Sequence, residues 1–177
     1  MTHRALAIDA AFKAGDLSAL RAALDDPGAL PNGPMPQSIG PCLTYAVYHS
    51  PLSFIRELLE LGADPNVDAG DGFPPLFAAL WQSTRTDTND LARLLLAYGA
   101  DPNQRGHNDY SVLHVAVLEE NLEVAGMLLE AGADLGIRTR IDDLETPREL
   151  AERRGASRCL ALFDHWTTRH PSEGNSR

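Results

Sequence analysis

A few side chains in this sequence belong to types that carry out chemistry, and their spacing decides which chemistry they could support. Asp142, Asp143 and Glu145 lie close together and could in principle act as a general acid and a general base. No partner group accompanies them, so we interpret them as part of a solvated loop. The segment "GDGF" at residues 70–73 contains two glycines, but it follows no predicted strand and opens no phosphate-binding helix. Neither feature predicts an active site.

The cysteines and histidines are spaced in a way that predicts no metal centre. Cys42 and Cys159 lie far apart and outside any CxxC motif, so we predict two buried, reduced thiols. No two histidines have the HxxxH spacing of a metal site, and none stands in a Cys-His or Ser-His-Asp arrangement. We therefore expect no catalytic residues, no metal site and no cofactor.

The charge of the chain limits the partners that it could bind. The formal net charge is -10, which argues against nucleic acid and anionic membranes, because phosphate binding relies on clustered Lys and Arg. Residues 1–134 carry 18 acidic and 7 basic side chains, whereas residues 135–177 carry 7 and 8. No run of 18 apolar residues exists, and Asp9 and Lys13 interrupt the apolar N-terminus, so we expect a cytoplasmic protein without a membrane span or signal peptide.

One phrase recurs along the chain and reveals an internal repeat. "LLELGADPN" at residues 58–66 returns as "LLLAYGADPN" at 94–103 and, less completely, as "LLEAGADLG" at 128–136. A second landmark precedes each phrase and appears once more near the C-terminus: "PCLTYAV", "PPLFAAL", "SVLHVAV" and "TPRELAE" at residues 41–47, 74–80, 111–117 and 146–152. Self-similarity at a period of 33 to 37 residues is typical of stacked repeat units.

The residues of the phrase explain how one unit ends and the next begins. "FIRELLELG" at 54–62 forms an apolar helical stripe that stops at Gly62, where an alanine would need a positive φ at a cost of about 1 kcal/mol. Asp64 and Asn66 have short side chains that close a turn by bonding nearby backbone amides. Thr146 is a good cap for the helix that begins at Pro147. Each phrase is therefore predicted to mark the end of one helix pair and the beginning of the connection to the next.

These landmarks resemble those of the ankyrin repeat family, with its Thr-Pro-Leu-His-x-Ala helix start and Gly-Ala-Asp-x-Asn helix end. The resemblance implies stacked pairs of antiparallel helices with protruding hairpin loops, and a role in binding other proteins, usually without catalysis. We predict an all-α ankyrin repeat solenoid over residues 1–166 with N- and C-terminal capping units, followed by a flexible tail at 167–177. The five units cover about residues 5–30, 41–66, 74–103, 111–136 and 146–166. The preference for Arg over Lys and the abundance of Ala and Leu suggest a bacterial origin. The sequence predicts no second domain, so we expect a stand-alone protein.

Two segments depart from the regular repeat. The third unit carries four extra residues in the polar segment 82–90, between its two helices. This insertion is either a neutral surface loop or a contact with a partner. The segment 31–41 contains four prolines and is predicted to be a stiff, extended strap in place of a hairpin loop.

The helix positions just after the small Ala motif are expected to point outward on the open face of the stack. These positions are Tyr48 and His49, Trp81 and Gln82, Leu118 and Glu119, and Arg153 and Arg154. Tyr48, Trp81 and Leu118 share one register in consecutive units and would form an apolar stripe of the kind found at protein-binding hot spots. In the alternative interpretation, Trp81 folds under the insertion as local core.

Two further aromatic residues belong to the predicted loops. Phe73 and Tyr110 share a register beside Asp71 and Asp109, and they either extend the binding face to the loop tips or pack between adjacent loops. His114 stands at the histidine position of the motif and is predicted to bond the backbone of the neighbouring loop. The predicted partner-binding residues are Tyr48, His49, Asp71, Phe73, Trp81, Gln82, Tyr110, Leu118, Glu119 and Arg153.

The resemblance favours a non-enzymatic interaction protein, expected to be a monomer, whose partner is another protein. The acidity of the chain favours a basic partner. One alternative is an immunity-type inhibitor of a basic toxic enzyme, and another is a structural adaptor in a larger assembly. An enzyme or ligand-binding domain would require a pocket that gathers several of His49, Trp81, Glu119 and Arg153 around a small molecule.

Overall fold

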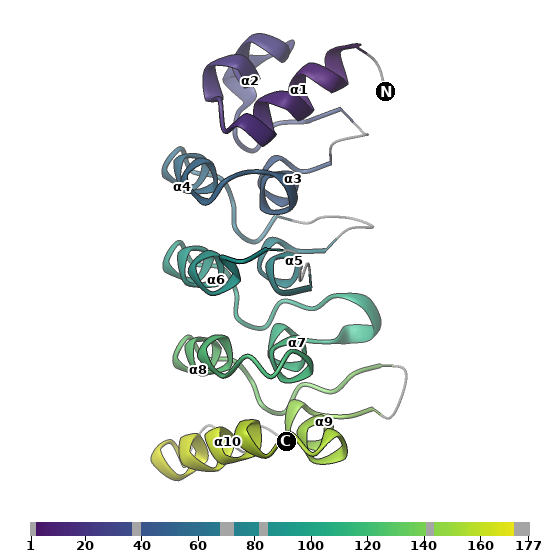
Figure 1. The fold of residues 1–177 in the computed structure, drawn as a ribbon, viewed down its shortest axis with the longest axis vertical. Coiled ribbons are helices and arrows are strands. Elements are labelled where there is room, and N and C mark those ends of the chain that lie inside the picture. Colours follow the sequence, from purple (N-terminus) through teal and green to yellow (C-terminus); the bar gives the residue numbers. More distant parts are fainter. Residues whose placement is uncertain (1–2, 37–39, 68–72, 82–84, 141–143, 172–177) are drawn as a thin grey trace.

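The computed structural model describes residues 3–36, 40–67, 73–81, 85–140 and 144–171. Within these ranges the α-helices form five antiparallel pairs stacked in one column, so the predicted all-α solenoid is confirmed (Figure 1). The pairs are α1 (His3–Ala14) with α2 (Leu17–Ala23), α3 (Cys42–His49) with α4 (Leu52–Glu60), α5 (Pro75–Trp81) with α6 (Thr88–Ala97), α7 (Val112–Leu118) with α8 (Leu122–Glu130), and α9 (Pro147–Arg154) with α10 (Ser157–Arg169). Two short 3-10 turns, Pro27–Ala29 and His107–Asp109, lie in the connections.

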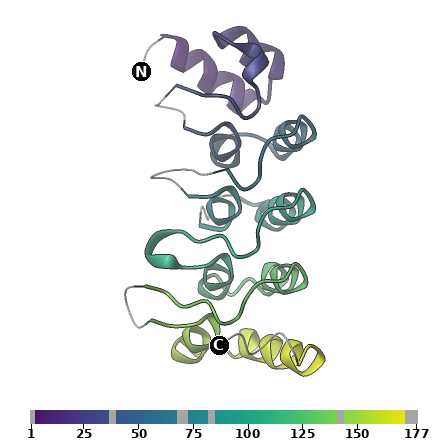
Figure 2. The ribbon, with the colours of Figure 1, turned by 180° about the vertical axis from the view of Figure 1, so that it is seen from behind.

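The first and second helices of the pairs form two parallel rows. Helices α3, α5, α7 and α9 make one row, and α4, α6, α8 and α10 make the other (Figure 1). Both views show that the long connections between pairs project on the side of the first row (Figure 2). We call α1, α3, α5, α7 and α9 the inner helices and their partners the outer helices. Helix α10 continues to Arg169, three residues beyond the predicted end of the fifth unit.

The outer helices of the middle units end as their sequence predicts. Gly62, Gly99 and Gly132 have φ values of 90°, 87° and 92°, in the left-handed region that glycine tolerates best. Directly after the first of these glycines, the Asn66 amide donates to Asp64 Oδ1 at 2.8 Å and closes the predicted turn.

The asparagines of the first three loops also bind the next unit. Asn66 Nδ2 donates to the Gly99 carbonyl at 2.9 Å, and Asn66 Oδ1 accepts from the Asp101 amide at 2.7 Å. Asn103 makes the same pair of bonds to Gly132 and Asp134, at 3.3 and 2.8 Å. Equivalent bonds from Asn32 reach Gly62 and Asp64 at 2.7 and 2.9 Å. These asparagines form a ladder of hydrogen bonds along the stack, which we call the asparagine ladder.

The core is continuous from one unit to the next. Phe12, Phe54, Phe77 and Phe163 are fully buried, and the apolar sides of all five pairs contribute to one cluster. A unit with two short helices cannot cover its own apolar surface, so burial depends on stacking. The two cysteines are buried free thiols, as predicted.

His114 fixes the start of α7 and the loop before α9. Its Nδ1 accepts from the Ser111 amide at 3.1 Å, and its Nε2 lies 3.0 Å from the Glu145 carbonyl. Nε2 therefore carries the proton and donates it to the neighbouring loop, as predicted. Burial lowers the pKa of this fully buried imidazole, which keeps it neutral at physiological pH.

Candidate protein-binding face

Three predicted residues occupy equivalent places at the ends of successive inner helices. Tyr48 lies in the last turn of α3, Trp81 ends α5 and Leu118 ends α7. Tyr48 and Leu118 are half-buried, whereas Trp81 is 44% exposed. We call these three residues, with the exposed His49 and Glu119 beside them, the inner-helix face.

Trp81 belongs to an aromatic cluster within its own unit. Its ring stacks on Phe77 with centroids 5.6 Å apart and planes 21° apart, and it meets Phe73 at 5.9 Å in an edge contact. Phe73 also lies 4.9 Å from Phe77. Because 44% of Trp81 is exposed, the residue is not local core. Buried Phe77 instead supports the indole from one side.

The loop aromatics pack on their own inner helices. Phe73 contacts Phe77 and Trp81, and the ring of Tyr110 lies 5.5 Å from that of His114 in an edge contact. Both loop residues remain half-buried. These contacts fix the bases of two connections beside the inner-helix face, which provides a physical reason for aromatic residues at these loop positions.

A polar cluster that no sequence motif predicted joins the first two units. Tyr45 Oη donates to Asp9 Oδ1 at 2.6 Å, and Lys13 Nζ lies 2.8 Å from Asp9 Oδ2. Burial and the Asp9 carboxylate raise the pKa of Tyr45 to about 12. The ring of His49 lies 4.4 Å from that of Tyr45, and burial together with Lys13 lowers the pKa of His49. The only sequence feature that indicates part of this cluster is the i,i+4 spacing of Asp9 and Lys13, which is typical of an ion pair on one helix.

The described part of the insertion folds back onto the preceding unit through Arg85. Arg85 Nη1 donates to the carbonyls of Val47 and Ser50 at 3.1 and 2.9 Å. The residue four places after Val47 is Pro51, which has no amide hydrogen, so Arg85 satisfies a carbonyl that the chain itself leaves open. The guanidinium also binds both carboxylate oxygens of Asp87 at 2.8 Å, which lowers the pKa of Asp87.

This anchor places the insertion beside the inner-helix face. Val47 and Ser50 directly flank Tyr48 and His49 in the chain, and the Arg85 side chain is only 12% exposed. The described insertion residues are therefore held at the end of α3. The spacing of Arg85 and Asp87 in the sequence indicates their ion pair. It does not indicate the carbonyls that Arg85 binds, which lie 35 to 38 residues away in the chain.

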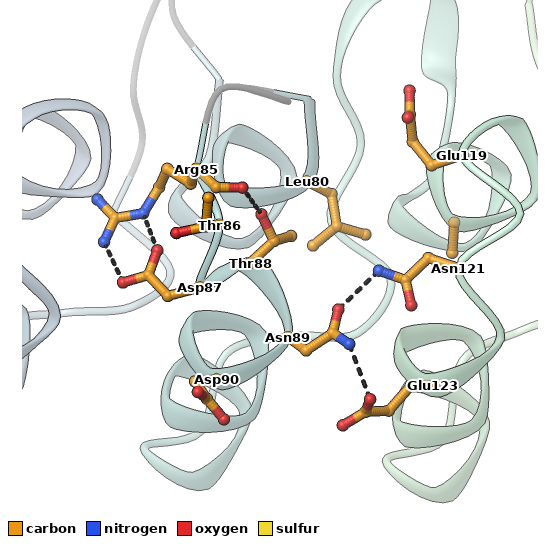
Figure 3. A pocket seen from close by; sticks show the side chains of 11 residues that line it. Leu80, Arg85, Thr86, Asp87, Thr88, Asn89, Asp90, Glu119, Asn121 and Glu123 are labelled. Carbon is orange, nitrogen blue, oxygen red and sulfur yellow. Dashed lines mark hydrogen bonds and ion pairs between the residues drawn. The ribbon is translucent and has the colours of Figure 1, made fainter.

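A polar hollow of about 550 Å³ lies between the insertion and the next unit (Figure 3). Its lining residues are Leu80, Arg85, Thr86, Asp87, Thr88, Asn89, Asp90, Ala116, Glu119, Asn121 and Glu123. Asn121 Nδ2 donates to Asn89 Oδ1 at 2.7 Å, and Asn89 Nδ2 donates to Glu123 Oε2 at 2.8 Å (Figure 3). This chain of bonds connects the starts of α6 and α8 and forms the floor of the hollow.

The fifth unit holds one predicted site residue in an internal ion pair. Arg153 Nε lies 2.5 Å from Glu145 Oε1, and Arg153 Nη2 lies 2.8 Å from Glu145 Oε2. Glu145 is only 8% exposed, so its assignment to a solvated loop is wrong. Arg153 keeps this carboxylate charged and lowers its pKa. The guanidinium of Arg153 therefore binds the chain's own carboxylate.

Some predicted residues lie outside the described residues, namely Asp71 and Gln82 of the binding face, Asp142 and Asp143 of the acidic loop, and residues 37–39 of the strap. Among the residues that are described, no group of three His, Cys, Asp or Glu is arranged to hold a metal ion. No described helix is both long and apolar enough to cross a membrane.

Stacked helix pairs with hydrogen-bonded loops define a helical repeat protein of the solenoid class. Comparison with known families matches residues 43–139 to the family model for ankyrin repeats in three copies. Because this match covers more than half of the sequence, the chain belongs to the ankyrin repeat family. Members of this family are generally binding modules without catalytic activity, which supports a role in protein–protein interaction.

Several characterised proteins are similar over part of their length. Cyclin-dependent kinase inhibitor 2A of Monodelphis domestica is 33% identical over 117 residues, which make up 66% of this chain and 64% of that protein. Ankyrin repeat and SOCS box protein 16 of Homo sapiens is 33% identical over 100 residues, 56% of this chain and 21% of the relative. Alpha-latroinsectotoxin-Lt1a of Latrodectus tredecimguttatus is 32% identical over 103 residues, 58% and 7% of the two chains. The chain thus spans less than two thirds of each of these relatives.

Proposed function

We propose that this chain binds a partner protein through the inner-helix face. The observation that carries the proposal is Trp81, an exposed indole supported by buried Phe77 and placed in register with Tyr48 and Leu118. Tryptophan and tyrosine are enriched among the residues that dominate binding energy, and an aromatic ring that is already ordered loses little conformational entropy on association.

The proposed contact surface extends from this stripe in two directions. Phe73 and Tyr110 continue it towards the connections between units, and His49 and Glu119 supply a polar border. Asp71, Gln82 and Arg153 remain predicted members of the surface. For Arg153, a contact would have to use the part of the side chain that its ion pair with Glu145 leaves exposed.

The net charge of -10 makes a basic protein the preferred partner. Opposite charge raises the rate of encounter and discriminates against acidic proteins, even where it adds little to the final affinity. We therefore expect association that slows as salt is added.

A narrower proposal is that binding inhibits the partner. It is favoured by the similarity to cyclin-dependent kinase inhibitor 2A, which covers about two thirds of both chains. In this form of the proposal, the chain occupies a surface that its partner needs for activity, and no further domain is required. Loss of the partner's activity on addition of the purified chain would support inhibition, and unchanged activity in the complex would exclude it.

The central test is affinity capture from a lysate of the source cells, followed by identification of the bound proteins by mass spectrometry. Three forms of the chain are compared: the unmodified protein, the Tyr48→Ala/Trp81→Ala double variant, and Tyr98→Ala. Tyr98 is an exposed aromatic residue of similar exposure (37%) at the end of outer helix α6, so its variant controls for the loss of an aromatic surface as such. Circular dichroism establishes that each variant is folded.

We expect a protein that is recovered with the unmodified chain and with Tyr98→Ala but is lost with the double variant. Equal recovery with all three forms would contradict the proposed face. Loss with Tyr98→Ala alone would place the binding surface on the outer helices instead.

A further inference from the structure

The fold holds the side chain of Trp81 rigid and leaves part of it open. Stacking on Phe77 at 5.6 Å covers one side of the indole, and the edge contact with Phe73 limits its rotation. Phe77 is completely buried and cannot move aside without disturbing the core. The exposed part of the ring is therefore a fixed aromatic surface, and the π-face of tryptophan is the best side-chain receptor for a cation.

Two cations of the neighbouring units are already paired within the chain itself. Lys13 pairs with Asp9 at 2.8 Å on α1, the inner helix that packs against α3. Arg85 is bound by Asp87 and by the backbone at the end of α3. Neither side chain can offer its full charge to an acidic partner without breaking these contacts.

Two carboxylates at the same end of α7, the next inner helix after α5, are not paired with a cation of the described chain. Glu119 and Glu120 directly follow Leu118, and both are exposed. Their carboxylates make no ion pair and no hydrogen bond with the described part of the chain. Glu119 and Glu120 therefore offer negative charge to a partner at this place.

Trp81 and Glu119 lie at the same end of two adjacent inner helices. Helix α5 packs directly against α7, and Trp81 is in register with Leu118, the residue before Glu119. Packed helices lie about 8–10 Å apart, which is comparable with the Debye length of about 8 Å at physiological ionic strength. A positive charge seated on the indole is therefore still attracted by the carboxylate.

We propose that Trp81 and Glu119 together receive an arginine from a basic segment of the partner protein. The guanidinium stacks on the exposed indole, and its positive charge faces Glu119. Arginine suits this place better than lysine because its planar group stacks on an aromatic ring and is more weakly hydrated than an ammonium. This inference rests on the proposed function and specifies the chemistry of the partner.

The test uses the intrinsic fluorescence of Trp81. The chain has two tryptophans, so the Trp166→Phe variant leaves Trp81 as the single reporter. Three blocked peptides of equal length, built from repeats of Arg-Ser-Gly, Lys-Ser-Gly or Glu-Ser-Gly, are titrated into this variant. We expect a saturable change in emission with the arginine peptide, an affinity for the lysine peptide weaker by a factor of about three, and no binding of the glutamate peptide.

Charge variants separate local attraction from the overall acidity of the chain. Glu119→Gln and Glu130→Gln each remove one negative charge, but Glu130 is an exposed residue at the end of outer helix α8. In the Trp166→Phe background we expect Glu119→Gln to weaken arginine-peptide binding by a factor of about three, and Glu130→Gln to leave it unchanged.

Equal affinities for the arginine and lysine peptides would overturn the proposal, as would equal effects of the two charge variants or an absence of arginine-peptide binding. Failure here is distinguishable from failure of the proposed function. A partner that is captured through Tyr48 and Trp81 while the arginine peptide does not bind would refute only the arginine chemistry. A partner that is still captured by the double variant would refute the proposed face itself.

Discussion

At the scale of single residues, two glycines of this chain are expected to respond in opposite ways to alanine. Gly99 has a φ of 87° at the end of its unit, whereas Gly126 lies inside helix α8. A Cβ added at either position would meet no atom within 4 Å, so backbone preference alone decides the effect. We predict that Gly99→Ala lowers the free energy of unfolding by about 1 kcal/mol and that Gly126→Ala raises it by about 0.5–1 kcal/mol.

Denaturant unfolding followed by circular dichroism measures both changes on the same protein. A stabilised Gly99→Ala variant would contradict the assignment of this residue as a left-handed helix stop. The stop was predictable from sequence because a positive φ is a property of one residue and its immediate neighbours. The same locality explains why the turn at Asp64 and Asn66 was predicted correctly.

At the scale of elements, the insertion of the third unit is expected to stabilise the end of helix α3. Arg85 satisfies the carbonyls of Val47 and Ser50 and is 12% exposed in its side chain. Removing it leaves these acceptors and Asp87 without their partner, so we predict that Arg85→Gln lowers the free energy of unfolding by about 1–3 kcal/mol. Thermal or denaturant unfolding of the variant provides the measurement.

Arg93 is the matched control for this prediction. It pairs with Asp90 and with Glu123 of the next unit, but its side chain is 54% exposed on an outer helix. Exposed ion pairs contribute about 0–1 kcal/mol, so Arg93→Gln should change stability much less than Arg85→Gln. Equal losses in the two variants would mean that the insertion is not anchored through the backbone of α3.

The contacts of these elements fall into two groups, those that could be predicted from the sequence and those that could not. The helix pairs and their glycine stops follow from motifs that repeat along the chain, and the bond from His114 follows from its place in the ankyrin motif. The bonds of Arg85 to α3 and of Tyr45 to Asp9 join residues 35 to 38 positions apart, and each occurs once. Such contacts depend on how two units stack, and no pattern within one unit encodes them. The error at Glu145 has a different cause: its partner Arg153 is only eight residues away, but the start of helix α9 lies between them and brings the two side chains together.

At the scale of the whole molecule, the asparagine ladder is expected to control how the stack opens. In a solenoid, stability is approximately a sum of unit terms and nearest-neighbour interface terms, so a weakened interface divides the molecule into two blocks. Asn66 bonds the second unit to the third, and Asn103 bonds the third to the fourth. Two pairs lie on the N-terminal side of the first interface, and two pairs lie on the C-terminal side of the second.

We therefore predict that Asn66→Ala and Asn103→Ala loosen opposite ends of the protein. Each variant should lose about 1–3 kcal/mol at its interface, because it loses two hydrogen bonds that contribute about 0.5–1.5 kcal/mol each. Asn66→Ala should accelerate amide hydrogen exchange mainly in α1 to α4, and Asn103→Ala mainly in α7 to α10, because the shorter block opens more readily in each case. Equal acceleration across all five pairs in both variants would show that the stack unfolds as one unit, and the ladder would then contribute stability without dividing the molecule.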